Sequence, residues 1–447
     1  MERVTIETGL GKVTGKEEKG VRVFSGIPYA ITERFELPKP YPKWDEFDAT
    51  GRPVDCFQYR AYHDESEGRY WFYHSEFRYD QNIPDWDFAE SPMTLNVITR
   101  SEAKDDPVLV FIHGGSFENG NVGEHPYGDS TEYAKHGIVY VSLGYRLNVF
   151  GLYKSGNYGL HDMVFGLRWI KDHIADFGGD PERITIMGQS AGAMSVMDLM
   201  YTQLLKDVVK GAVMMSGAGA VPDFAGPLTP EESDEKFWSK VRERAGAKTE
   251  EEFRKLPDRT IFQAWYDTSL EIGSVRTQQP GIDGTIIPKL PSKIMREGSY
   301  LDVPVIAGVT SQDFMPYLIF ELAIGLGKLR SRRGQSPVWG YMFDKTPPGD
   351  MFKAYHAADL WYVFGNFHQS WRPFDKSDEK LKDEMVHYIA NFVKWGNPNG
   401  DGLPYWPKIS RRNRKFRLFD GEKGGLIGPM RCRYKEWKSF LLDKGPM

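Results

Sequence analysis

Apolar runs recur along the chain at intervals that predict β-strands alternating with helices. The first thirty residues alternate apolar and polar side chains in short segments joined by glycine-rich turns, which predicts antiparallel strands. Later apolar runs are continuous, and they include LNVIT, PVLVFIHGG, GIVYVSLGYR, RITIMGQS, GAVMMSG, VPVIAGVT and KFRLFD. Continuous runs of this kind are typical of strands that are buried on both faces of a parallel sheet.

Segments with apolar residues at helical spacing lie between several of these runs. The clearest is HDMVFGLRWIKDHIADFGG, residues 161–179, which ends in two glycines that suit a helix C-cap. The alternation predicts an α/β fold with a mostly parallel central sheet, helices on both faces and antiparallel strands at the N-terminus. We expect one domain over residues 1–447, with an aromatic loop insertion at 57–92 and a helical, cap-like insertion at 224–290.

Composition narrows the class of protein. The chain has 447 residues, of which 14% are aromatic, and a net charge of −5 without a basic stripe, so nucleic acid is not an expected partner. No apolar run reaches the about 18 residues that a membrane span needs. The two cysteines are too few for a disulfide framework, and the N-terminus lacks the layout of a signal peptide. A cytoplasmic, reduced protein is the simplest interpretation, and secretion with a removed leader stays open.

The stretch ITIMGQSAGAMSV, residues 184–196, carries the first candidate for chemistry. An apolar strand pattern ends at Gly188-x-Ser190-x-Gly192, and a helical pattern follows at once. This is the sequence of a nucleophile elbow, a sharp strand-to-helix turn that exposes the serine oxygen above the sheet. The glycines have a steric reason, because strand and helix approach too closely there for side chains. Ser190 is therefore a candidate nucleophile.

A second glycine-rich turn supplies candidate donors for an oxyanion. The strand pattern VLVFI is followed by His113 and then by a Gly-Gly-Ser sequence. Such a turn presents backbone N–H groups toward a nucleophile, and the N–H of Ala191 adds another donor. We expect His113 to brace this turn.

A serine nucleophile also needs a base and an acid. The chain order serine, acid, histidine of this kind of sheet leaves His356, His368 and His387 as candidate bases. His356 precedes an aromatic helical pattern, where a loop residue can face the sheet edge, whereas His387 lies inside a helix pattern. The chain contains neither H-E-x-x-H nor C-x-x-C, so neither a metal site nor a cofactor is expected.

Several motifs together resemble the type-B carboxylesterases of the α/β-hydrolase superfamily, which include bacterial para-nitrobenzyl esterases and the cholinesterases. The motifs are FSGIPYA, FIHGGSF, NYGLHDMVFGLRWIKDHIADFGGDPERITIMGQSAGA, HAADLWYVFGN and NFVKWGNPNG. The resemblance implies that Ser190 is the nucleophile and His356 the base. It also implies that the N–H groups of Gly115, Ser116 and Ala191 form the oxyanion hole.

The chain departs from this family pattern in three places. The position that resembles the family's catalytic glutamate is Asp313, within GVTSQDFMPY. Cys56 resembles the first cysteine of a family disulfide, but its partner position is Met93, so that bridge is not expected. The chain is also short for the family around 218–290, so the family's substrate preference is not carried over.

We therefore expect a serine esterase that forms an acyl-enzyme on small or aromatic carboxylic esters, with Ser190, His356 and Asp313 as its catalytic triad. Asp359 competes with Asp313 for the acid role, because it lies three residues after His356. A non-catalytic binding or adhesion relative, and a hydrolase of amides, thioesters or lipids, remain the alternative functions. The aromatic loop at 57–92 favours aryl esters if it faces the pocket and is otherwise surface scaffold. The sequence leaves the oligomeric state open.

Overall fold

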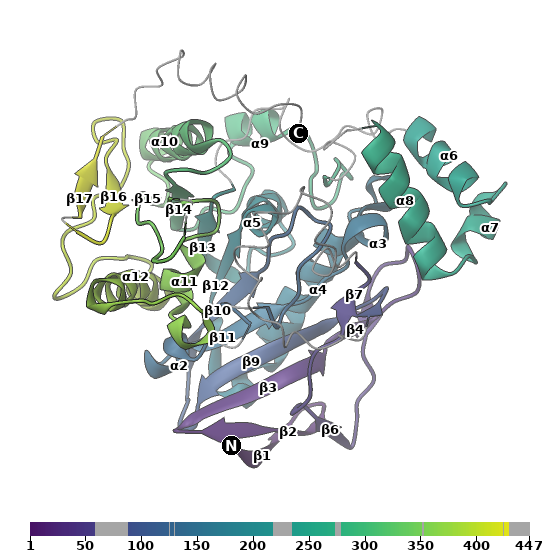
Figure 1. Ribbon diagram of the computed structural model, residues 1–447, viewed down its shortest axis with the longest axis horizontal. Helices are drawn as coiled ribbons and strands as arrows, with labels where there is room; N and C mark the ends of the chain where they lie inside the picture. The colour runs from purple at the N-terminus through teal and green to yellow at the C-terminus, as the bar shows by residue number, and fades with distance from the viewer. Residues whose placement is uncertain are drawn as a thin grey trace.

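The computed structural model describes residues 1–58, 88–124, 126–128, 130–217, 235–272, 279–350, 353–422 and 424–428. A large twisted sheet runs through the molecule (Figure 1), with the strand order β1-β2-β3-β9-β11-β10-β12-β13-β14-β15-β16-β17 and with β6 beside β2. The strands are β1 (Glu2–Thr8), β2 (Gly11–Glu18), β3 (Val21–Pro28), β6 (Glu46–Asp48), β9 (Thr94–Arg100), β10 (Asp106–Ile112), β11 (Val139–Leu143), β12 (Gly179–Gln189), β13 (Val209–Met215), β14 (Val305–Thr310), β15 (Val338–Phe343), β16 (Phe416–Phe419) and β17 (Gly425–Ile427). Two small two-stranded sheets pair β4 (Ala30–Ile31) with β5 (Lys39–Pro40) and β7 (Asp55–Cys56) with β8 (Phe88–Ala89).

The centre of the large sheet is parallel and its two ends are antiparallel. Strands β11, β10, β12, β13, β14, β15 and β16 pair in parallel, whereas β1, β2, β3, β9 and β11 form antiparallel pairs. The last pair, β16 with β17, is antiparallel as well. The predicted mostly parallel sheet with N-terminal antiparallel strands is therefore confirmed.

Helices cover both faces because the strand side chains alternate between two cores. In β10, Val108, Val110 and Ile112 belong to one hydrophobic cluster, while Leu109 and Phe111 belong to the other. The first cluster contains side chains of α4 (Tyr158–His173), α5 (Ala191–Tyr201) and α10 (Pro316–Arg333). The second contains side chains of α2 (Glu132–Lys135), α11 (Leu360–Phe364) and α12 (Lys376–Trp395).

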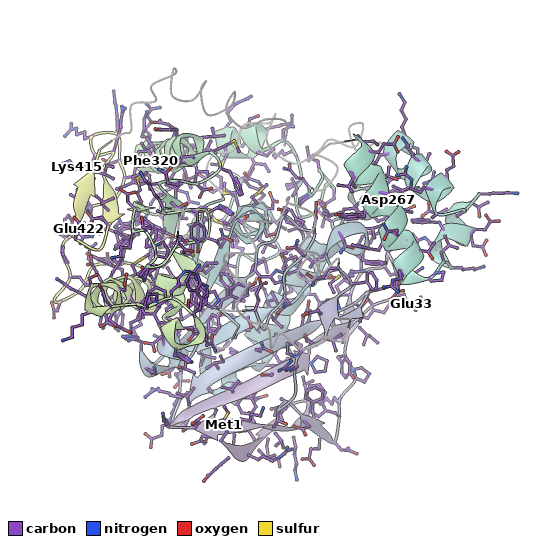
Figure 2. The ribbon with its side chains drawn as sticks, viewed as in Figure 1. Met1, Glu33, Asp267, Phe320, Lys415 and Glu422 are labelled. Carbon is purple, nitrogen blue, oxygen red and sulfur yellow. The ribbon has the colours of Figure 1, made fainter. Side chains whose placement is uncertain are left out.

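A group of helices extends from one side of the sheet (Figure 1), and consists of α6 (Glu235–Arg244), α7 (Glu250–Arg254) and α8 (Asp258–Ile272). In Figure 2, Asp267 of α8 and Phe320 of α10 lie on opposite sides of the molecule. Aromatic rings join the group to the rest: Phe253 stacks 5.6 Å from Tyr153, whose ring also stacks 4.1 Å from Phe35. Two further helices are α3 (Asn148–Leu152) and α9 (Pro291–Glu297).

Helices α6, α7 and α8 fall within the predicted cap-like insertion at 224–290, whose described part is 235–272 and 279–290. Of the predicted aromatic loop at 57–92, residues 59–87 lie outside the described residues.

The sequence pattern did not predict β15, although all six of its residues are buried. Gly340 at its centre interrupts the apolar run, and glycine weakens a strand pattern. The structure gives the reason for the glycine, since a Cβ there would lie 2.5 Å from the ring of Phe416. Packing against Phe416 of the neighbouring strand β16 leaves no room for a side chain at this position.

Cys56, the last residue of β7, is a buried free thiol. The backbone N–H of Leu147 donates to its Sγ atom at 3.3 Å, and burial raises its pKa to about 12. Cys432 lies outside the described residues.

Across the part of the chain that the structure describes, we find no helix with both the length and the apolar character to cross a membrane.

A buried ion pair fixes the segment after β11 to the start of α4. The guanidinium of Arg146 donates to both carboxylate oxygens of Asp162, at 2.8 and 2.7 Å, and its backbone N–H donates to the same carboxylate at 3.0 Å. The exposed fractions of the two side chains are 1% and 0%. Removal of one partner would leave an uncompensated charge away from water.

We predict that Asp162→Ala lowers the free energy of unfolding by about 3–5 kcal/mol, because it leaves the buried Arg146 charge without its partner. The control is Asp207→Ala, which removes the carboxylate that lies 3.5 Å from Arg168 at the surface. That variant should change stability by no more than about 1 kcal/mol. Urea denaturation followed by circular dichroism measures both, and equal effects would contradict the prediction.

Candidate active site

Ser190 lies at a sharp turn between β12 and α5. Figure 1 shows both elements in the central part of the molecule. Its backbone has φ 57° and ψ −126°, a conformation that residues with a Cβ rarely adopt. The N–H of Ser190 donates to the carbonyl of Met215 at 2.8 Å, which holds the turn against the end of β13. Ser190 is half-buried, so its side chain is not sealed in the core.

Glycines make this turn sterically possible. A Cβ on Gly188 would lie 2.3 Å from the carbonyl oxygen of Gly192, and a Cβ on Gly192 would lie 2.1 Å from the carbonyl oxygen of Ile112. A Cβ on Gly217 would lie 2.4 Å from the carbonyl oxygen of Ser190. The predicted reason for the first two glycines, close approach of strand and helix, is therefore what the structure shows.

The loop after β10 lies directly beside the nucleophile turn. A Cβ on Gly114 would stand 3.0 Å from the Cβ of Ser190. Gly115, Ser116 and Phe117 follow with φ values of 101°, 59° and 61°. No described residue accepts a hydrogen bond from the N–H of Gly115 or Ser116. Ala191 is the first residue of α5, where a backbone N–H has no acceptor within the helix.

His113, the residue directly before Gly114, contacts this loop through its side chain. Its ring stacks on Tyr145 with 4.4 Å between centroids, and its Nδ1 lies 2.9 Å from the carbonyl oxygen of Gly114. Burial lowers the pKa of His113 to about 4, so the ring is neutral near pH 7 and Nδ1–H donates to that carbonyl. The hydroxyl of Tyr145 donates to the carbonyl of His113 at 2.8 Å.

Two further polar residues hold the same loop and were not found from the sequence. The amide of Gln58 bridges Gly120, donating to its carbonyl at 3.1 Å and accepting from its N–H at 2.9 Å. The backbone N–H of Asn148 donates to the carbonyl of Phe117 at 2.6 Å, and its side-chain amide donates to the carbonyl of Glu118 at 3.3 Å. The sequence gives no signal for either contact, because each residue meets the loop only after folding.

His356 and Asp313 come together from the loops after β15 and β14. The Nδ1 atom of His356 lies 2.8 Å from Oδ1 of Asp313. Asp313 also accepts hydrogen bonds from the hydroxyl of Thr310 at 3.0 Å and from the N–H of Phe314 at 2.8 Å. Both loops are tied together by the N–H of Gln312, which donates to the carbonyl of Ala354 at 3.0 Å. The carboxylate is therefore held in place from two sides.

The two groups shift each other's pKa. Burial lowers the pKa of His356, but the charge of Asp313 and the hydrogen bond to it outweigh that effect, so the pKa lies above its ordinary value of 6.5. Burial raises the pKa of Asp313, and the charge of His356 with the hydrogen bonds it receives brings that pKa below 3.8. Asp313 is therefore ionised near pH 7, and it holds the proton of the neutral ring on Nδ1.

The competing acid, Asp359, has a different partner. Its Oδ2 accepts a hydrogen bond from the hydroxyl of Tyr341 at 2.6 Å, and the side chain is fully buried. Burial raises the pKa of Asp359 to about 6.

The other two candidate bases, His368 and His387, are both exposed. The ring of His387 packs 4.7 Å from that of His136.

The side of His356 that faces the nucleophile turn meets Gln189. The Nε2 atoms of the two side chains are 3.1 Å apart, and Gln189 is the residue before Ser190. Among the described residues it is Gln189 and not Ser190 that hydrogen-bonds to Nε2 of the ring. Phe314, 54% exposed, places its ring 4.7 Å from that of His356.

This arrangement has the parts for acyl transfer. A hydroxyl at a strained turn, a histidine oriented by a buried carboxylate and adjacent backbone donors are what nucleophilic attack on a carbonyl requires. Within the described residues, no group of three or more His, Cys, Asp or Glu side chains could hold a metal ion.

Comparisons with known proteins agree with this chemistry. A model of the carboxylesterase family matches residues 2–331 and 322–425. The para-nitrobenzyl esterase of Bacillus subtilis is 27% identical over 93% of this chain and 95% of its own length. Liver carboxylesterase 1 of Oryctolagus cuniculus is 26% identical over 90% of this chain and 87% of its own.

Solved structures show the same architecture. A para-nitrobenzyl (PNB) esterase structure superposes with a TM-score of 0.81 at 24% identity, covering 97% of this chain and 98% of the other. A carboxylesterase of Geobacillus stearothermophilus superposes with a TM-score of 0.77 at 27% identity, covering 97% and 99%. These similarities confirm the α/β-hydrolase fold that the sequence predicted.

Proposed function

The chain belongs to the carboxylesterase family, and on that premise we propose that Ser190, His356 and Asp313 hydrolyse carboxylic esters through an acyl-enzyme. Serine carboxylic-ester hydrolysis is the activity of this family, so a non-catalytic adhesion role is not favoured. The observation that carries the residue assignment is the strained backbone of Ser190, with φ 57°, beside the N–H groups of the β10 loop. Strain of this kind in a residue other than glycine is stored at functional sites.

Each group has a defined part in the reaction. His356 Nε2 takes the proton of the Ser190 hydroxyl as its oxygen attacks the ester carbonyl, and Asp313 stabilises the imidazolium that forms. The negative oxygen of the tetrahedral intermediate accepts hydrogen bonds from the N–H groups of Gly115, Ser116 and Ala191.

The imidazolium then protonates the leaving alcohol. A water molecule, deprotonated by His356, attacks the acyl-enzyme and releases the acid.

For the substrate, we propose small or aromatic carboxylic esters. The similarity to a para-nitrobenzyl esterase and the exposed ring of Phe314 beside His356 support an aromatic group near the base. Amides, thioesters and lipid esters share the same acyl-transfer chemistry and remain the alternative substrates. An ester panel that varies the acyl and alcohol parts separately tests the proposal, and it fails if aliphatic long-chain esters are hydrolysed with the highest kcat/KM.

We also propose a single domain in which α6, α7 and α8 act as a cap. Side chains of these helices, including Trp238, Phe253 and Trp265, belong to the same hydrophobic cluster as α4 and α5, which supports one domain. A cytoplasmic location is proposed from the free, buried thiol of Cys56, which is typical of proteins in reducing compartments.

We predict that Ser190 carries the covalent chemistry. An organophosphonate should label this residue stoichiometrically, as located by peptide mass spectrometry. Ser190→Ala should lower kcat by about 10⁴ to 10⁶. The neighbouring Ser195, whose hydroxyl donates to the carbonyl of Ala191 at 3.0 Å, provides the control position for labelling. Full esterase activity in the Ser190→Ala variant would contradict the assignment.

Asp313 and Asp359 should respond differently to removal of their charge. Asp313→Asn should lower kcat by about 10⁴ because the imidazole is then held in the wrong tautomer. Asp359→Asn should mainly lower the melting temperature. In the wild type the buried carboxylate accepts a hydrogen bond from the hydroxyl of Tyr341, and the variant places amide N–H groups at this buried position. Steady-state kinetics and calorimetry on both variants separate the roles. The reverse pattern would identify Asp359 as the acid.

The pH dependence follows from the raised pKa of His356. The base works only as neutral imidazole, so kcat/KM should rise with pH and reach half its maximum above about 6.5. Hydrolysis of a para-nitrophenyl ester, followed between about pH 5 and 9, measures this midpoint. A flat profile, under conditions where acylation limits the rate, would count against His356.

A further inference from the structure

Gln189 stands between the base and the oxyanion loop. Its Nε2 atom is 3.1 Å from Nε2 of His356, while its Oε1 atom is 3.1 Å from the position that a Cβ of Gly114 would occupy. The side chain is 5% exposed, and the contact joins residues 167 positions apart in the chain. Gln189 is thus packed against both halves of the proposed machinery.

The proton positions on the ring decide what this contact does. Nδ1 lies 2.8 Å from the carboxylate of Asp313, which only accepts hydrogen bonds when ionised, so Nδ1 carries the proton of the neutral ring. Nε2 then has a single lone pair. The amide N–H of Gln189 donates to that lone pair, and it is the same lone pair that takes the proton of Ser190 during attack.

We propose that Gln189 is a positioning residue that latches His356 in the resting enzyme and releases Nε2 when an ester occupies the site. This inference rests on the proposed function, because it requires His356 to be the base. The latch keeps the ring oriented toward the nucleophile turn before substrate arrives. It also has to break for each acylation, since one lone pair cannot accept from Gln189 and Ser190 together.

The latch has a measurable effect on protonation. A hydrogen bond donated to the neutral ring stabilises the neutral form, so its loss makes the ring easier to protonate. Among the described residues, the charged groups that act on the ring are Asp313, bonded to Nδ1, and Asp359. Both carboxylates stay in place when the amide of Gln189 is replaced, so the difference between variant and wild type measures the effect of the side chain at position 189.

The test uses Gln189→Met, which keeps the length of the side chain and removes the donor. The pH dependence of the second-order rate constant for organophosphonate labelling of Ser190 reports on the free enzyme. Its acidic midpoint should move to higher pH by about 0.5–1 unit. At the alkaline plateau, where the ring is neutral in both proteins, labelling and kcat/KM should stay within about twofold of the wild-type values or exceed them.

Gln189→Glu tests the same contact with a charge. A carboxylate facing Nε2 stabilises the imidazolium, so the midpoint should move to higher pH by more than in the Met variant, by about 1–3 units. The matched control is Gln312→Met, which makes the same change at an exposed side chain one residue before Asp313 and should leave the midpoint unchanged. Melting temperatures of all three variants check that they are folded.

Two results would overturn the latch. An unshifted midpoint in folded Gln189→Met or Gln189→Glu would show that the side chain does not act on Nε2. A loss of tenfold or more at the alkaline plateau of folded Gln189→Met would show that Gln189 is needed during the reaction itself. If the wild-type protein is not labelled at Ser190 or shows no titration, the proposed function fails instead, so the two failures are distinguishable.

Discussion

The contact between the first turn of α5 and the end of β10 is the constraint on which the site depends. Gly192 lies so close to the carbonyl of Ile112 that a Cβ would stand 2.1 Å from it, and this closeness sets where Ser190 leaves the sheet. The loop after β10 begins at the same point, so this contact places both Ser190 and the N–H groups proposed to bind the oxyanion. Close backbone packing at this contact leaves little room for the two segments to shift against each other.

Different hydrogen-bond partners distinguish two buried carboxyl groups of the same chemical type. Asp313 meets a histidine, a threonine hydroxyl and a backbone N–H, and its pKa falls below the ordinary value. Asp359, a few residues along the histidine loop, meets the hydroxyl of Tyr341, and burial raises its pKa to about 6. Environment rather than residue type therefore decides which carboxyl is suited to pair with the imidazole.

Local steric rules allowed part of the molecule to be predicted from sequence, whereas His356 and Asp313 were assigned from the resemblance to a family. The turn at Ser190 needs glycines on either side, so a short motif marks it, and continuous apolar runs mark the buried strands. Strand β15 was not predicted, and its Gly340 lies against the ring of Phe416, a contact that only the folded sheet shows. The contacts of Gln58 and Asn148 with the β10 loop, and of Gln189 with His356, join residues far apart in the chain. No local pattern encodes such pairings.

The order of the proposed catalytic groups along the chain has a consequence for how the site is assembled. Gln189 and His356 are separated by 167 positions, and the strands β13, β14 and β15 that lie between them in the chain pair in parallel. Parallel pairing of this kind depends on long loop closures and forms slowly. Because synthesis runs from the N- to the C-terminus, Ser190 is made well before His356. The proposed triad can therefore be complete only after β13, β14 and β15 have been added to the sheet.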